Sequence, residues 1–190
     1  EGNIYDFGAR SMDAVWDEIE EAGLPVTHHI GETPPKTPCE HNSVVVGMMV
    51  NVDSFREQFA KYLFSGILDR HPKLQIGWFE GGIAWVPTAL QDAEHLLASY
   101  QHMFNHQLEH DIRHYWDHHM SASFMVDPLG LRLIDDIGVD KVMWSSDYPH
   151  NESTWGYSEK SLATVVDAVG PENAAKIVST NVQKFLGLTK

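Results

Sequence analysis

Apolar and polar positions follow two different periods along this chain. In some segments apolar side chains recur at helical spacing, which is typical of helices with one buried face. Other segments are short apolar runs bounded by Gly, Pro, Asp or Ser, which are typical of buried strands. The short runs predict strands within residues 24–31, 73–82, 120–126 and 139–150. The helical pattern covers residues 11–22, 43–72, 85–118, 129–138 and 158–186, and we expect two helices in the last segment.

The predicted order is a helix followed by four strand–helix units. Strands that alternate with helices indicate a parallel sheet with right-handed crossovers. No strand is followed by the G-x-G-x-x-G fingerprint of a dinucleotide-binding sheet. Each strand instead ends near polar residues, namely His28 and His29, Glu80, residues 121–123 and Asp147. Polar strand ends on one edge are expected of a (β/α)8 barrel, and four units make half of one.

Composition narrows the class of protein further. The chain has 190 residues, 43% of them hydrophobic and 21% charged, which fits one soluble globular domain segment over residues 1–190. Its net charge is −14, and Lys and Arg form no cluster, so we expect neither a nucleic-acid nor an anionic membrane partner. Cys39 is the single cysteine, so no disulfide forms within the chain. This usage favours the cytoplasm.

Asp147 is the first candidate for chemistry. The run VMWSSDYPH goes directly from an apolar strand into this carboxylate, and a proline follows two residues later. A carboxylate in that place can bind a metal ion or take a proton from a metal-bound water. Asp also caps turns, so the pattern alone leaves both interpretations open.

The strand PVTHHIG offers two histidines with opposite directions. Side chains alternate along a strand, so His28 and His29 face different sides of the sheet. A single strand histidine is more often structural than a metal ligand. The presence of Asp147 at another strand end favours a ligand role for one of the two.

Glu80 lies among apolar residues in IGWFEGGIAW. Such surroundings would raise the pKa of an unpaired carboxyl group by desolvation. A group of this kind suits a general acid, a metal ligand or a hydrogen-bond partner for substrate, and the alternative is a structural ion pair below the loops. Gly81 and Gly82 allow a close backbone approach or a positive φ.

A histidine ladder is the most conspicuous metal-binding pattern in the chain. Its members are His102, His106, His110, His114 and His118, with His119 beside the last. Each step of four residues drifts by about 40° around a helix of 3.6 residues per turn, so the drift reaches about 160° over the ladder. The five imidazoles therefore cannot meet at one ion, although adjacent pairs can. We expect mainly a polar helix surface.

Four segments of the sequence resemble one known family. GLPVTHHIGE, SGILDRHPKLQIGWFEGGIAWVP, DKVMWSSDYPHNESTW and IVSTNVQKFLGL are similar, in order and in spacing, to the amidohydrolase-related family. Its members are metal-dependent (β/α)8-barrel enzymes that include hydrolases and non-oxidative decarboxylases of aromatic acids. The resemblance implies the C-terminal half of such a barrel, about strands five to eight. It also implies that the missing N-terminal half completes the metal site and covers the open sheet edge.

The resemblance assigns roles to individual residues. It implies that His29 and Asp147 are metal ligands and that Asp147 also transfers a proton. Glu80 stands where the family commonly has a catalytic histidine, which is a departure from the pattern. Segments expected at the pocket mouth supply further candidates for substrate binding. These are Glu32, Trp78, Trp85, Tyr148 and His150.

The expected function is that of a metal-dependent hydrolase. A divalent metal, Zn or Mn, would activate a water that attacks a small, aromatic or partly apolar substrate. One alternative is a non-oxidative decarboxylase of an aromatic carboxylic acid, which shares this metal site. A second alternative is a non-catalytic half-barrel that binds a partner chain, and a third is a histidine-rich metal buffer built on the ladder. We also expect a homo-oligomer.

Overall fold

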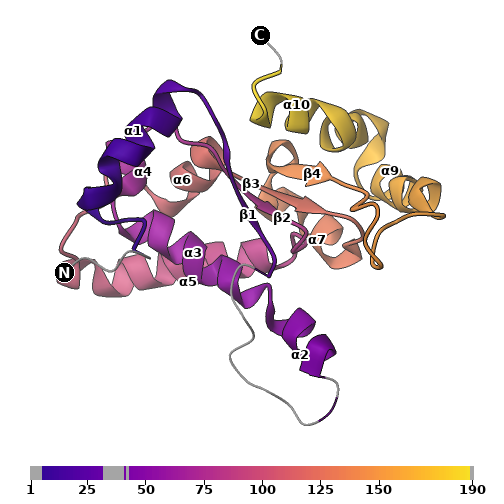
Figure 1. Ribbon diagram of the computed structural model, residues 1–190, viewed down its shortest axis with the longest axis horizontal. Coiled ribbons are helices and arrows are strands. Elements are labelled where there is room, and N and C mark those ends of the chain that lie inside the picture. The colour runs from indigo at the N-terminus through magenta and orange to yellow at the C-terminus, as the bar shows by residue number, and fades with distance from the viewer. Residues whose placement is uncertain (1–5, 32–40, 42, 189–190) are drawn as a thin grey trace.

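The computed structural model describes residues 6–31, 41 and 43–188 and contains one parallel sheet (Figure 1). Its strands β1 (Val26–His29), β2 (Ile76–Phe79), β3 (Met120–Phe124) and β4 (Val142–Trp144) pair in chain order. The predicted parallel sheet with sequential crossovers is therefore confirmed. Such an order is that of neighbouring strands in a (β/α)8 barrel.

Helices precede, connect and follow the strands. They are α1 (Asp13–Glu21), α2 (Ser43–Val50), α3 (Asp53–Phe64), α4 (Ile67–Arg70), α5 (Trp85–Tyr100), α6 (Ile112–His119), α7 (Pro128–Arg132), α8 (Ile134–Ile137), α9 (Ser158–Ala175) and α10 (Asn181–Phe185). The helical pattern predicted over residues 85–118 is interrupted between α5 and α6. Gly170, with a φ of 75°, and Pro171 divide α9, because proline removes a backbone donor. No helix among the described residues is long and apolar enough to cross a membrane.

The two faces of the sheet have different surroundings. On one face Trp78 of β2 is fully buried and packs against Phe59 of α3, Trp85 of α5 and Trp116 of α6. Aromatic rings in such contacts contribute strongly to a core. Trp78 therefore belongs to the hydrophobic core and does not lie at a pocket mouth, contrary to expectation.

The opposite face of the sheet carries Gly77, Phe79 and the polar strand ends. The C-terminal helix α10 reaches this face through Phe185, whose ring lies 5.8 Å from that of Phe79. A Cβ on Gly77 would meet the Phe185 ring at 2.6 Å, so only glycine fits beneath it. Helix α10 lies near β4, whereas α1 lies near β1 (Figure 1). This face of the sheet is thus partly covered by α10.

His119, the last residue of α6, makes the stability of the core depend on pH. The side chain is buried, and its Nδ1–H donates to the Leu74 carbonyl at 3.0 Å. Burial, helped by the nearby His114, His118 and Lys141, lowers the pKa of His119 below its ordinary value of 6.5. The unfolded chain therefore binds a proton at pH values where the folded chain does not. The contribution of His119 to the free energy of unfolding is fully present above pH 6.5, and it decreases as the pH falls below that value.

We therefore expect a larger free energy of unfolding at about pH 7.5 than at about pH 5.5, with His119 contributing part of the difference. Urea unfolding of the wild type and of His119→Asn at both pH values would measure this contribution. Asparagine keeps a side-chain N–H for the Leu74 carbonyl and removes the titration, so the difference should be smaller in the variant. An equal difference would assign the acid sensitivity to other groups.

Candidate metal centre

Four polar side chains from three strand ends form a continuous cluster. His150 Nδ1 lies 3.2 Å from Glu80 Oε1 and 3.1 Å from Asp147 Oδ2. On the other side, Glu80 Oε2 makes a close contact with Nε2 of His29 at the end of β1. Residues that are more than one hundred positions apart in the sequence therefore meet at one edge of the sheet. This is the edge at which parallel α/β sheets build their sites.

The backbone at the two carboxylates is unusual. Glu80 has a φ of 70° and Asp147 has a φ of 55°, and these are the non-glycine residues with positive φ in the described part of the chain. Left-handed conformations cost energy for residues with a Cβ, and they concentrate at functional sites. Glu80 directly follows β2, and Asp147 comes three residues after the end of β4, so each conformation redirects a carboxylate close to a strand end. The strain thus marks the same two residues as the side-chain geometry does.

Neighbouring backbone and side-chain groups hold the two turns in place. The Glu80 N–H donates to Ser123 Oγ of β3 at 3.2 Å, and Ser123 is buried. The His150 N–H donates to the Asp147 carbonyl at 3.0 Å, which closes the turn after β4. The Thr154 N–H donates to the Ser146 carbonyl at 2.9 Å. These bonds fix the directions in which both carboxylates leave the backbone.

Asp127, in the segment after β3, holds the loop that follows Glu80. Its Oδ2 accepts hydrogen bonds from the N–H groups of Ile83 at 2.7 Å and Ala84 at 2.9 Å. Its Oδ1 accepts from the Gly130 N–H at 2.7 Å and thereby caps α7. One carboxylate therefore joins two loops at the edge of the sheet that carries the cluster.

The protonation states of the cluster are coupled. Burial raises the pKa of Glu80, as expected from its apolar surroundings, while hydrogen bonding to His150 and the charge of His29 act in the opposite direction. Hydrogen bonding to Glu80, together with the charges of Asp147 and Glu80, raises the pKa of His150. The cluster therefore places a carboxyl group with a raised pKa next to an imidazole with a raised pKa.

His29 is oriented like a metal-binding histidine. Its Nδ1 lies 2.8 Å from the Ile30 carbonyl, which can only accept, so Nδ1 carries the proton. In neutral His29 the lone pair is then on Nε2, and Nε2 faces the Glu80 carboxylate. Two acceptors in contact need a proton or a cation between them. A backbone carbonyl that fixes the tautomer in this way is common for metal-ligating histidines.

The donor set fits a divalent metal ion. Glu80, Asp147 and His150 each offer one ligand atom, and these atoms lie within 4.8 Å of one another. They form the one such group of three found among the described residues. Carboxylate oxygen and imidazole nitrogen suit Zn and Mn. His29 extends this group through Glu80.

The remaining predicted site residues have different locations. Trp85 is half-buried at the start of α5, where its Nε1–H donates to the Gly82 carbonyl at 3.1 Å. Tyr148 is exposed, and its ring lies 4.8 Å from the exposed ring of Trp155. Glu32 lies outside the described residues. Tyr148 is therefore the aromatic candidate that remains next to the cluster.

Sequence reasoning did not single out Asp127 and Trp155 as parts of this region, and it gave Ser123 only as one of the polar strand-end residues 121–123. The Ser-Ala-Ser alternation in a buried strand was a signal for Ser123, because a polar residue at every second position places hydroxyl groups on one face. Asp127 before Pro128 was a helix-capping signal. The contact of Asp127 with the loop after β2 has no sequence signal, since 44 residues separate it from Ile83.

The histidine ladder does not build the cluster. His106 Nε2 lies 2.6 Å from the buried carboxylate of Asp69. The same carboxylate accepts a hydrogen bond from the Tyr115 hydroxyl. His119 lies in the core, and His102 is exposed in a short 3-10 turn, Gln101–Met103. The expectation that the ladder cannot converge on one ion agrees with the absence of a three-histidine group among the described residues.

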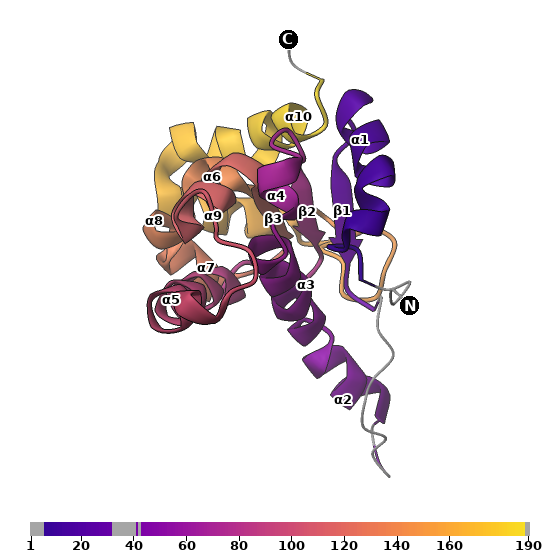
Figure 2. The ribbon, with the colours of Figure 1, turned by 90° about the vertical axis from the view of Figure 1, so that its left-hand side faces the viewer.

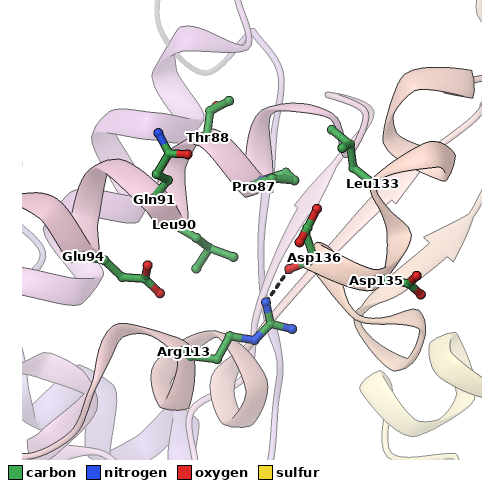
Figure 3. A pocket seen from close by; sticks show the side chains of 9 residues that line it. All are labelled: Pro87, Thr88, Leu90, Gln91, Glu94, Arg113, Leu133, Asp135 and Asp136. Atoms are coloured by element: carbon green, nitrogen blue, oxygen red, sulfur yellow. Dashed lines mark hydrogen bonds between the residues drawn. The ribbon is translucent and has the colours of Figure 1, made fainter.

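A surface pocket of about 540 Å³ lies between α5, α6 and α8 (Figure 3). Arg113 is its single basic group among the lining residues, and it donates to the carbonyls of Asp136 and Ile137. The lining residues are Pro87, Thr88, Leu90, Gln91, Glu94, Arg113, Leu133, Asp135 and Asp136. None of them belongs to the cluster at the strand ends, so the pocket is separate from the candidate metal centre.

Comparison with known proteins gives both a family and a fold. The sequence profile of the family described as Amidohydrolase matches residues 1–188. An amidohydrolase from Mycobacterium avium subsp. paratuberculosis has a similar structure, with 22% identity and a TM-score of 0.76. The match covers 97% of this chain and 47% of that one.

Two aromatic-acid decarboxylases are also similar in structure. For 5-carboxyvanillate decarboxylase from Sphingomonas paucimobilis the identity is 19% and the TM-score 0.73, with 100% of this chain and 57% of that chain covered. For a dihydroxybenzoic acid decarboxylase from Polaromonas sp., with bound manganese and the inhibitor 2-nitroresorcinol, the values are 15% and 0.72, with coverage of 97% and 56%. The chain spans about half the length of these solved structures.

Proposed function

This chain belongs to the amidohydrolase family, and from that premise we propose that Glu80, Asp147 and His150, with His29, form part of a divalent-metal site for a small carbonyl or carboxylate substrate. The observation that carries the proposal is the convergence of these donors at one sheet edge, within 4.8 Å for the first three. The left-handed backbone at both carboxylates supports the same residues.

We propose further that the four-stranded unit is the C-terminal half of a (β/α)8 barrel. The sequential parallel order of the strands supports this, as does the coverage of about half of each similar structure. In a closed barrel both edge strands are paired, whereas β1 and β4 each have one neighbour in the described part of the chain. The remaining strands would supply the other ligands. A cytoplasmic location stays a prediction from the single cysteine.

The proposed metal is Zn or Mn, and it would supply Lewis-acid chemistry to a bound substrate. Asp147 would hold or move a proton at its carboxylate, and Glu80 would offer a carboxylate oxygen to the ion. His150, between the two, would keep their relative positions. A similar structure with manganese bound supports the choice of metal.

Hydrolysis and decarboxylation remain two reactions of the same proposed site. Hydrolysis was the first expectation, and the aromatic-acid decarboxylases among the similar structures make decarboxylation an equally supported alternative. The exposed Tyr148–Trp155 pair supports an aromatic substrate in either case. The proposed substrate is thus a small aromatic acid for decarboxylation, or an aromatic ester or amide for hydrolysis.

Metal uptake and turnover test this proposal directly. The chain, first stripped with a chelator, would be dialysed against Mn²⁺ or Zn²⁺, and its ring-proton spectrum recorded. We expect the ring signals of His29 and His150 to shift or broaden. The loaded protein, combined with an N-terminal half-barrel, should turn over hydroxybenzoates with release of CO₂, or aryl esters and amides with release of acid. Metal uptake without any turnover, also after addition of an N-terminal half-barrel, would favour the non-catalytic alternative. Unchanged His29 and His150 signals would refute the site.

Helix α2 supplies a surface for the expected partner. It projects away from the body of the protein (Figure 1 and Figure 2). Large exposed apolar side chains follow one another along it: Val44, Val45, Val46, Met48, Met49 and Val50. A helix that is apolar on all sides is normally buried. Its exposed side chains amount to on the order of 600 Å², which is at the upper end of the largest patch on a typical monomer.

We propose that α2 packs against α2 of a second copy of this chain. Residues 44–50 carry no charge that would select a partner of opposite charge, so the same apolar surface of a second copy is a matching partner. Val45 and Met49 are 65% and 80% exposed and lie one turn apart. They would meet their own copies near the two-fold axis.

The double variant Val45→Glu/Met49→Glu should dissociate this dimer, because like charges would face each other across the axis. We expect at least about a tenfold weaker association, measured by sedimentation velocity. Leu96→Glu on α5, where the side chain is 44% exposed, adds the same charge elsewhere and should leave the dimer intact. A monomeric wild type at a concentration of about 50 μM would contradict the proposal.

A further inference from the structure

Three histidines of the ladder stack into a column on the surface. The ring centroids of His110 and His114 are 3.8 Å apart with planes inclined by 22°, and those of His114 and His118 are 4.0 Å apart with planes inclined by 21°. His114 and His118 lie one turn apart on α6, and Asp111 caps this helix by accepting from the His114 N–H at 2.7 Å. The cap fixes the helix start and therefore the position of the column.

The nitrogen atoms of the column are prepared to bind a cation. His118 Nδ1 lies 2.9 Å from the His114 carbonyl, which can only accept, so Nδ1 carries the proton and neutral His118 has its lone pair on Nε2. Desolvation and the neighbouring imidazoles of His118 and His110 lower the pKa of His114. His114 therefore favours the neutral form, which is the state in which imidazole binds metals.

The spacing of the two rings matches a shared ion. A Zn–N bond is about 2.0–2.1 Å long, so two nitrogens on one ion are at most about 4 Å apart. The ring centroids of His114 and His118 are 4.0 Å apart, and the side chain of His118 is exposed, so it rotates readily. Rotation of the rings alone would let both Nε2 atoms point to one ion. Histidines at positions i and i+4 bind Zn in this way in other helices.

The charges around the column favour a cation. The carboxylates of Asp111 and Asp117 stabilise the protonated form of His114 and would stabilise a bound cation equally. The nearest guanidinium on α6, Arg113, is occupied by Asp117 at 3.1 Å and by the carbonyls of Asp136 and Ile137. Its positive charge is thus partly compensated.

We propose that His114 and His118 bind one first-row divalent cation, such as Cu²⁺, Ni²⁺ or Zn²⁺, with waters completing its shell. This surface site shares no residue with the strand-end cluster, and it is independent of the proposed enzyme function. Among these ions Cu²⁺ binds most tightly to a given nitrogen site. His110 stacks on His114, but it lies before Asp111, the N-cap of α6. The helix therefore does not fix its position, and we expect it to contribute less to binding the ion. The bound ion joins two turns of α6 and stabilises that helix.

Titration with Ni²⁺ tests the proposal. By calorimetry the wild type should bind one more Ni²⁺ than His114→Asn/His118→Asn, and Cu²⁺ should broaden the ring-proton signals of His114 and His118. The control His95→Asn/His102→Asn removes two exposed histidines outside the column and should keep the site. Asp147→Asn should also keep it, which separates this site from the strand-end centre. Equal Ni²⁺ stoichiometry in the wild type and in His114→Asn/His118→Asn, with circular dichroism reporting intact helices, would overturn the inference.

Discussion

Replacing Asp147 by asparagine should remove the metal from the strand-end centre and lower turnover by about 10²–10⁴-fold, the range for loss of a positioned acid or base. Asp147 is a donor in the group of three and contacts His150 at 3.1 Å. The amide of asparagine is neutral, so it binds a divalent cation weakly and cannot accept a proton near pH 7. Elemental analysis and the rate with the best substrate would measure both effects.

The backbone at Asp147 makes this substitution a clean test. Its φ of 55° lies in the left-handed region, where Asn and Asp are the most frequent non-glycine residues. The variant should therefore fold like the wild type, with a melting temperature within a few degrees. Asp167→Asn, at an exposed position on α9, removes the same charge away from the centre and should change neither metal content nor rate. Full metal occupancy and rate in Asp147→Asn would exclude this carboxylate from the site.

Strand periodicity predicted the sheet and its site-bearing edge, since buried runs and polar strand ends are local features of the sequence. Residues two positions apart in a strand point to the same face, however, so Trp78 and Glu80 would share one face if β2 continued through Glu80. The structure separates them. Glu80 has left the strand, and its φ of 70° turns its side chain toward His29, while Trp78 stays among the helices. The sequence does not predict this left-handed backbone conformation, because Glu rarely adopts it.

Long-range contacts were the other feature that the sequence could not supply. His150 was expected as a substrate contact and His29 with Asp147 as ligands, whereas the structure groups Asp147 with Glu80 and His150. Which strand ends meet depends on the turns after β2 and β4. The turn after β2 is held by Ser123 and Asp127, residues from a third strand and its loop. The turn after β4 is closed by its own backbone bonds, such as that from the His150 N–H to the Asp147 carbonyl. The positions of the chemical groups therefore depend on tertiary bonds between loops.

Asp127 should consequently matter for both stability and the site. In Asp127→Ala the N–H groups of Ile83, Ala84 and Gly130 would lose their acceptor. A lost helix cap costs about 1 kcal/mol. A hydrogen bond to a charged group contributes roughly 1.5–3 kcal/mol. Because water can reach part of this half-buried site, we expect about 3 kcal/mol in total, or a melting temperature lower by roughly 6–12 °C for a chain of this size.

The same substitution should also release Glu80. The loop from Gly81 to Ala84 would no longer be tied to the segment after β3, so metal affinity at the strand-end centre should decrease even though no donor is removed. Asp127→Asn retains one acceptor oxygen and should have an intermediate effect, while Asp167→Ala should leave stability within about 0.5 kcal/mol of the wild type. Calorimetric melting and metal titration of the three variants would measure these effects. If Asp127→Ala lowered stability but left metal affinity unchanged, the loop would be a structural element and Glu80 would be positioned by the Ser123 bond alone.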